Sequence, residues 1–137
     1  MLQKRKDIIA VALFHTDSLS LVCANVDVEK QWWIVAFDCK EAKVPKDWDC
    51  VLPSDVALQL PGADAPTVLL SDRAEVKQAG YDRQNDHPIV FCTKVRKAHE
   101  YLRAKNVATG PIQEVGGIES FEVRDPDGNV IEICKEP

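Results

Sequence analysis

The sequence predicts an α+β fold built from two copies of one unit, in which a strand, a helix and three further strands follow one another (βαβββ). Three observations predict it. The chain of 137 residues has room for one ordinary domain, residues 1–137. Segments with the two-residue period of strands alternate with segments of helical period. This order recurs after a shift of about 67 residues, which lays Ser20 on His87. We therefore expect a first module over residues 18–74 and a second over residues 86–135.

The composition predicts a folded, soluble domain with a small-molecule partner. Apolar residues make up 45% and charged residues 28% of the chain, which is enough apolar material for a buried core. The formal net charge is -5, from 17 Lys and Arg against 22 Asp and Glu, without a long cationic run. Nucleic acid and anionic membrane surfaces attract cationic patches, so neither is expected as the main partner.

The first module begins with a strand and a helix. Residues 18–26 (SLSLVCANV) alternate with the two-residue period of a strand. The apolar residues from Val28 to Phe37 then have helical spacing, and Asn25 or Asp27 can cap that helix.

Two strands separated by turn-forming residues end the first module. They are expected over residues 55–60 (DVALQL) and 67–71 (TVLLS). A further strand is expected around residues 40–44 or 50–52. Residues 72–86 are charged and have little apolar periodicity, so we expect a connector there.

The second module repeats the order of the first. Residues 87–93 (HPIVFCT) predict a strand and residues 95–105 a helix, which Asn106 can end in the left-handed conformation. Three further strands are expected, over residues 111–115, 119–124 and 130–134. The run DPDGN before the last strand predicts a hairpin turn, because proline presets one backbone dihedral and Gly128 supplies a positive φ.

The N-terminal residues 1–17 have no predicted role. Their apolar run from Ile8 to Phe14 follows basic residues, as in a signal peptide, but Asp7 interrupts the approach and no small-residue cleavage site follows. We expect a strand or a short packed helix there. No other run approaches the roughly 20 apolar residues that span a bilayer. The five cysteines form no CxxC pair, which indicates a reducing cytoplasm.

The end of the chain resembles a known family. Residues 121–137 (FEVRDPDGNVIEICKEP) resemble the C-terminal signature of the vicinal oxygen chelate superfamily, which includes glyoxalase I, the bleomycin resistance proteins and the extradiol dioxygenases. Residues 25–40 (NVDVEKQWWIVAFDCK) and 87–107 are similar to the starts of that family's two modules. The resemblance implies paired βαβββ modules that form a curved mixed sheet around a cavity, usually in a homodimer.

The resemblance also implies where a metal ion would bind. In metal-dependent members, ligands project from the first and last strands of each module, and the corresponding positions are Ser20, Leu69, His87 and Glu132. Imidazole and carboxylate bind divalent ions well, whereas a serine hydroxyl is a poor ligand and leucine is none. The cofactor therefore stays open: one divalent ion (Ni, Zn, Mn or Fe) held by His87 and Glu132, or no ion.

Glu132 is a candidate on its surroundings alone. It lies in the apolar strand VIEIC, where a carboxylate must be paired, protonated or bound to a ligand. The alternative is a salt bridge or hydrogen bond to a strand neighbour such as Arg124, Lys94 or Lys135. A perturbed carboxylate in a cavity is a functional candidate, so we predict a catalytic role for Glu132.

The remaining ligand-binding candidates are His87, Phe91 and Trp48. His87 opens a strand with Phe91 on the same face, so both can line a cavity with Glu132; the alternative is a partly exposed histidine beside Pro88. Trp48 lies in the polar segment VPKDWDCVLP, where an aromatic side chain can line a ligand site or plug one end of the sheet.

Two main functions are compatible with these residues. A small-molecule binder of the glyoxalase/bleomycin resistance type would use a concave cavity at the module or dimer junction, and Ser20 and Leu69 at ligand positions favour it. A metal-dependent lyase, isomerase, thiol transferase or dioxygenase-like enzyme would instead use His87 and Glu132 as ligands. A module that serves only interaction or regulation is a third possibility.

Overall fold

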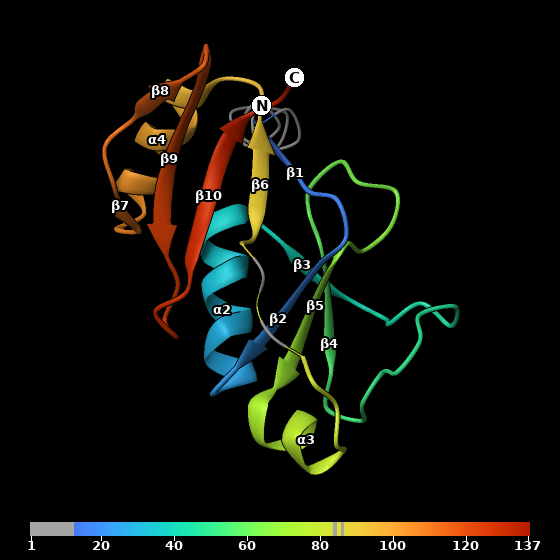
Figure 1. The fold of residues 1–137 in the computed structure, drawn as a ribbon. Helices are drawn as coiled ribbons and strands as arrows, with labels where there is room; N and C mark the ends of the chain where they lie inside the picture. The colour runs from blue at the N-terminus through green and yellow to red at the C-terminus, as the bar shows by residue number, and fades with distance from the viewer. Residues whose placement is uncertain (1–12, 84, 86) are drawn as a thin grey trace.

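The α+β class predicted from the sequence is confirmed. The computed structural model describes residues 13–83, 85 and 87–137 of the chain. Two separate mixed sheets form, one mainly from each half of the sequence, and the helices α2 (Val26–Phe37) and α4 (Val95–Ala104) pack against them (Figure 1).

The first sheet comes from the first half of the chain. Its strands lie in the order β2 (Leu19–Cys23), β5 (Val68–Asp72), β4 (Val56–Gln59) and β3 (Lys40–Ala42). β2 and β5 are parallel, and their register places Ser20 opposite Leu69. Of the two positions left open by the sequence, the extra strand is therefore β3, while residues 50–52 form none.

The second sheet comes from the second half, with one exception. Its strands lie in the order β1 (Phe14–His15), β6 (Ile89–Cys92), β10 (Val130–Lys135), β9 (Ile118–Arg124) and β7 (Ala108–Thr109), and β8 (Gln113–Val115) also pairs with β9. β6 and β10 are parallel, with Ile89 opposite Glu132. The exception is β1, which joins this sheet through β6. Leu13 of the same apolar run is buried in the core, and residues 8–12 lie outside the described residues.

The helix ends follow local capping chemistry. The Asn25 side chain accepts a hydrogen bond of 3.1 Å from the Val28 amide, so Asn25 rather than Asp27 caps α2. Asn106, which follows α4, has a φ of 62°. This is the left-handed conformation that the sequence predicts for the residue that ends this helix. The predicted connector, residues 72–86, is not entirely a loop. It contains the short helix α3 (Arg73–Gln78). A helix this short buries one side chain, Val76, and therefore shows no apolar period.

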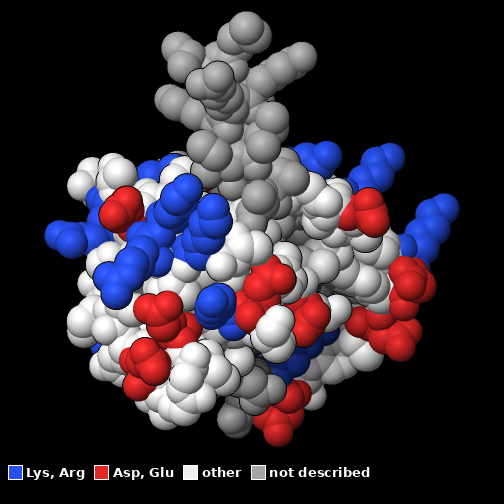
Figure 2. All heavy atoms as spheres, turned by 90° about the horizontal axis from the view of Figure 1, so that it is seen from above, with Lys and Arg blue, Asp and Glu red and all other residues white. Residues whose placement is uncertain are grey.

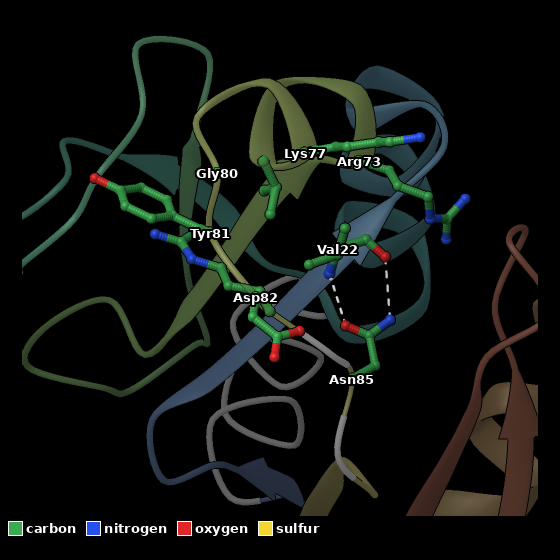
Figure 3. Close-up of a pocket in the computed structure, with 9 residues that line it drawn as sticks. Val22, Arg73, Lys77, Gly80, Tyr81, Asp82 and Asn85 are labelled. Carbon is green, nitrogen blue, oxygen red and sulfur yellow. Dashed lines mark hydrogen bonds between the residues drawn. The ribbon is translucent and has the colours of Figure 1, made fainter.

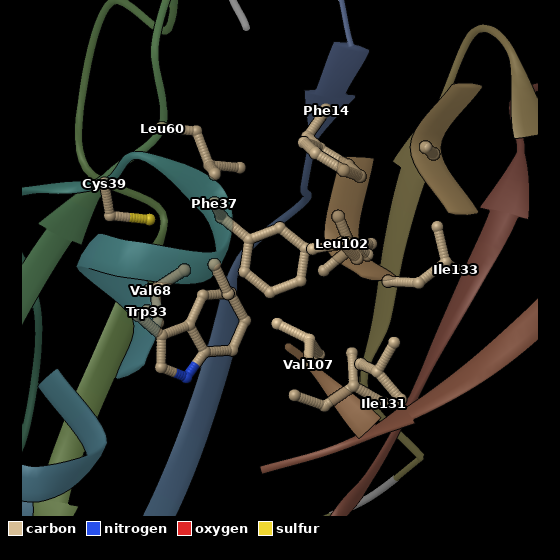
Figure 4. Close-up of a cluster of buried hydrophobic side chains, with 14 of the residues drawn as sticks. Phe14, Trp33, Phe37, Cys39, Leu60, Val68, Leu102, Val107, Ile131 and Ile133 are labelled. Atoms are coloured by element: carbon tan, nitrogen blue, oxygen red, sulfur yellow. The ribbon is translucent and has the colours of Figure 1, made fainter. Parts of the chain in front are cut away.

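One hydrophobic core joins the two halves of the chain. Trp33 and Phe37 of α2 lie in it together with Leu102 of α4 and Ile131 of β10 (Figure 4). The ring of Phe14 meets that of Phe37 edge to face, with centroids 5.0 Å apart. α2 packs against β4 and β5 of the first sheet, and α4 packs against β7, β9 and β10 of the second, so each sheet has one face covered by a helix.

The surface carries both signs of charge. Figure 2 shows Lys and Arg interspersed with Asp and Glu over one face of the molecule. Among the described residues, no helix combines the length and the apolar character needed to cross a membrane.

The core makes a direct prediction about stability. Phe37 is fully buried, so Phe37→Ala should lower the free energy of unfolding by about 3–5 kcal/mol through lost burial and a new cavity. Urea denaturation followed by circular dichroism measures this change. Val35→Ala is the control on the same helix, because Val35 is 56% exposed, and it should change stability by less than about 0.5 kcal/mol. Equal effects of the two substitutions would contradict the proposed core.

Candidate ligand-binding site

Within one chain, five of the six predicted site residues lie in two pockets. The first, the β2–β5 pocket, has a volume of about 500 Å³ and contains Ser20, Trp48 and Leu69. The second, the β9–β10 pocket, has a volume of about 530 Å³ and contains His87 and Glu132. The two pockets share no lining residue. The structure thus divides between two sheets the positions that the sequence assigned to one cavity.

The β2–β5 pocket is lined by two adjacent strands and by the loop that carries Trp48. Ser20 and Leu69 are direct neighbours across the parallel strands β2 and β5, on the face that points away from the core. Trp48 lies in the loop between β3 and β4, where its amide donates a 3.2 Å hydrogen bond to the Pro45 carbonyl. This turn brings the half-buried indole into the same pocket, so three of the predicted residues meet here.

Arg83 adds a fixed cation to the β2–β5 pocket. Its guanidinium donates to the Ser71 hydroxyl at 3.0 Å and to the Cys50 carbonyl, and lies 3.8 Å from the Asp55 carboxylate. The Asp55 side chain is fully buried, and its Oδ1 has no hydrogen-bond partner in the structure. Sequence analysis missed Arg83, because a lone arginine in a charged connector carries no distinguishing pattern.

Glu132 is the centre of the β9–β10 pocket. Its Oε2 lies 2.5 Å from His87 Nε2, and its Oε1 accepts a 2.8 Å hydrogen bond from the Cys134 thiol. Both carboxylate oxygens therefore have a partner. His87 and Glu132, which the sequence analysis expects to line one cavity, are therefore neighbours. Glu132 also bonds to its strand neighbour Cys134, in line with the structural alternative, but its ion-pair partner among the described residues is His87 and none of Arg124, Lys94 and Lys135.

These contacts set the ionisation of the pair. The hydrogen bond from Cys134 is the largest cause that lowers the pKa of Glu132, with further contributions from His87 and Ser120, while burial opposes them. Burial first, and then the hydrogen bond to Glu132, raise the pKa of Cys134 to about 12. Cys134 is therefore a neutral donor and Glu132 a carboxylate at neutral pH. With His87 beside it, Glu132 can accept a proton or a hydrogen bond from a ligand.

An apolar rim, which sequence analysis also missed, borders the β9–β10 pocket. Val115 and Ile118 face each other across the β8–β9 hairpin, and they are 73% and 56% exposed. Phe91 lies on the Glu132 face of the sheet but outside the pocket lining, and its ring stacks on His15 with centroids 5.3 Å apart.

A third pocket, of about 570 Å³, lies beside α3 and contains none of the predicted site residues (Figure 3). The Asn85 side chain forms one wall: it accepts from the Val22 amide at 2.7 Å and donates to the Val22 carbonyl at 3.0 Å. Arg73 and Lys77 of α3 form another. Arg73 is engaged by Asp127, with 2.5 Å between Nη2 and Oδ2, so this pocket borders the contact between the two halves.

The side chains present do not form a complete metal site within one chain. Across residues 13–83, 85 and 87–137, no group of three or more His, Cys, Asp or Glu is placed to bind an ion. His87 and Glu132 bond to each other, and Ser20 and Leu69 lie in the other pocket. Two donors fall short of the three or four protein ligands that transition-metal sites use.

Solved structures share this fold. Lactoylglutathione lyase from Agrobacterium tumefaciens matches with a TM-score of 0.68 at 16% identity, over 88% of this chain and 92% of that one. A glyoxalase/bleomycin resistance protein/dioxygenase from Nocardioides matches with a TM-score of 0.64 at 14% identity, over 98% and 91% of the two chains. The fosfomycin resistance protein FosX from Listeria monocytogenes matches with a TM-score of 0.60 at 12% identity, over 90% and 93%.

These likenesses define the class of fold. The chain has the glyoxalase/bleomycin resistance fold, which is consistent with the vicinal oxygen chelate superfamily that residues 121–137 resemble. No protein-family model and no curated protein matches the sequence. At identities of 12–16%, the solved structures support a common fold and leave the activity of this chain to its own residues.

The hydrogen bond from Cys134 generates a prediction about Glu132. Cys134→Ala removes the largest cause of the lowered pKa, so the pKa of Glu132 should rise toward its ordinary value, as measured by a carboxyl carbon NMR titration. Cys134→Ser keeps a donor at this position and should keep the pKa low. An unchanged titration in the alanine variant would show that the thiol does not act on Glu132.

Proposed function

We propose that this protein binds a small molecule in a site that two copies of the chain complete together. Modules 18–74 and 86–135 would each supply one half, the β2–β5 pocket of one copy facing the β9–β10 pocket of the other. The observation that carries this proposal is the division of the predicted site residues between two open pockets on separate sheets. Each pocket alone presents a wall and a floor, while binding sites usually enclose most of a ligand.

The two pockets offer complementary contacts. The β2–β5 pocket supplies the Trp48 ring, which suits a planar group, and the apolar side chain of Leu69. The β9–β10 pocket supplies the hydrogen-bonded pair of His87 and Glu132. A ligand with a planar apolar part and a polar donor group would use both. Glu132 would fix its orientation or accept its proton, and Phe91 would support the pocket through the strand next to it.

A metal-dependent enzyme is the second candidate, because one observation favours it: His87 and Glu132 are adjacent. Such an enzyme would be a lyase, an isomerase or a thiol transferase with these residues as ligands to Ni, Zn, Mn or Fe. Ser20 and Leu69 would add no strong ligand even if a second copy brought them to the pair. This is why we place ligand binding first. The five free cysteines support a cytoplasmic location for this binding.

The shared site can be tested by mixing variants. With 1-anilinonaphthalene-8-sulfonate as the probe, Trp48→Ala and His87→Ala should each weaken binding by about 5- to 10-fold, through lost aromatic and polar contacts. After subunit exchange, an equal mixture should regain about a quarter of the wild-type sites, because half of the dimers would carry one intact site.

Val35→Ala is the control for this experiment. Val35 of α2 is 56% exposed and lies outside both pockets, so its loss should leave the affinity unchanged. Sedimentation should show a dimer. A monomer that binds the probe as tightly as the predicted dimer, or a mixture without recovery, would contradict the shared site.

The metal alternative has its own test. Chelator-treated protein titrated with nickel, zinc, manganese and ferrous ions should show no stoichiometric binding, because the pair offers two ligands. Isothermal calorimetry on wild type, His87→Ala and Glu132→Gln measures this directly. Tight binding of one ion per chain that both variants abolish would establish the metal-dependent enzyme instead.

A further inference from the structure

A carboxyl group with no role in either pocket is buried where the two halves of the chain meet. Glu29 of α2 is 1% exposed and belongs to the largest fully buried side chains. The indole nitrogen of Trp33 donates a 3.1 Å hydrogen bond to its Oε2. No lysine or arginine among the described residues forms an ion pair with it. A buried carboxylate without a cation is costly, so the state of Glu29 depends on its other neighbours.

The carboxyl group of Asp125, which begins the DPDGN turn, acts on Glu29 through a side-chain hydrogen bond and through its charge, and both effects raise the pKa of Glu29. Asp125 is 6% exposed. It accepts hydrogen bonds from the Asp127 amide at 3.0 Å, from the Asn129 amide at 2.7 Å and from the Asn129 side chain at 3.0 Å. Two carboxyl groups can share a hydrogen bond only if one of them keeps its proton.

The donors around the pair decide which group holds that proton. Asp125 receives three N–H donors, which stabilise its carboxylate, whereas Glu29 receives one. Burial is the main cause that raises the pKa of Glu29 to about 9, followed by the hydrogen bond and the negative charge of Asp125; the Trp33 bond opposes them. Glu29 is therefore the acid and Asp125 the carboxylate.

The charges that face the pair belong to three other parts of the fold. Cys23 of β2 is a neutral thiol, because burial and the nearby carboxylates raise its pKa to about 12. Asp127 in the turn adds a negative charge, and Arg73 of α3 neutralises it at 2.5 Å. Asp127 also accepts a 3.3 Å hydrogen bond from the Ala24 amide. The turn of the second half is thus held against β2, α2 and α3 of the first half.

We propose that Glu29 and Asp125 form a proton-dependent joint between the two halves of the chain. The Glu29 carboxylic acid donates to the Asp125 carboxylate, and this bond holds the DPDGN turn against the first half. When Glu29 loses its proton, two adjacent buried carboxylates repel each other and the joint opens to water. The joint lies outside both ligand pockets, so this inference is independent of the proposed function.

The sign of the pH effect follows from the raised pKa. In the unfolded chain Glu29 ionises near its ordinary value, about 4.3. The folded protein thus binds one more proton than the unfolded chain between that pH and about 9. The stability that the protonated pair contributes is fully present below about pH 4.3. It declines as the pH rises and is lost once the folded-state pKa is passed.

Glu29→Gln tests this joint. The amide keeps the size of the side chain, donates to Asp125 and accepts from Trp33, but it does not titrate. Raising the pH from 5 to 8 should destabilise wild type more than the variant. The difference between their melting temperatures, variant minus wild type, should therefore grow by at least about 4 °C over this range. At about pH 8, hydrogen exchange at the Asp127 and Asn129 amides should be faster in wild type than in the variant.

The control is Glu100→Gln, which removes one exposed carboxylate from α4 and should melt in parallel with wild type at every pH. Parallel pH profiles for wild type and Glu29→Gln would overturn the proposal. If Glu29→Gln does not fold, a carboxyl NMR titration of wild type decides the question. A Glu29 signal that titrates near pH 4 would overturn the joint, and one that stays protonated above pH 7 would support it.

Discussion

The alternation of side chains along the central strands is the constraint on which this structure depends. On β2 and β5, Leu21 and Leu70 enter the core, while Ser20 and Leu69 point away from it. β10 obeys the same rule, since Ile131 and Ile133 are buried and Glu132 between them faces the pocket. Because the helices cover one face of each sheet, the opposite faces are left to build sites.

Two glutamates next to this core show how the state of a buried carboxyl group depends on its partners. Glu132 is held as a carboxylate by His87 and Cys134, and it is half-buried at the pocket wall. Glu29, in the core itself, pairs with no cation among the residues that the structure describes, and its raised pKa keeps it protonated. The same residue type therefore takes opposite protonation states at neutral pH in one small domain, according to the donors and the water around each group.

Much of the fold was predictable because its signals are local. The alternation in β2 and the turn chemistry of DPDGN each depend on a few neighbouring residues, and so does the Asn106 cap. The helix α3 was not predictable, since six residues with one buried side chain have no period to detect. Arg83 was missed for a different reason: its partners Ser71 and Asp55 are distant in sequence.

By itself the sequence determined the α+β class and the order of most elements, because periodicity and turn residues specify which faces point inward. Its resemblance to a known family directed attention to His87 and Glu132, and the tertiary structure decided that the two bond to each other. Only the tertiary structure decided that Ser20, Trp48 and Leu69 occupy a separate pocket, and that Glu29 meets Asp125 across the joint. These outcomes depend on how two sheets and two helices pack around one core. Such packing sums many weak long-range contacts that no local pattern records.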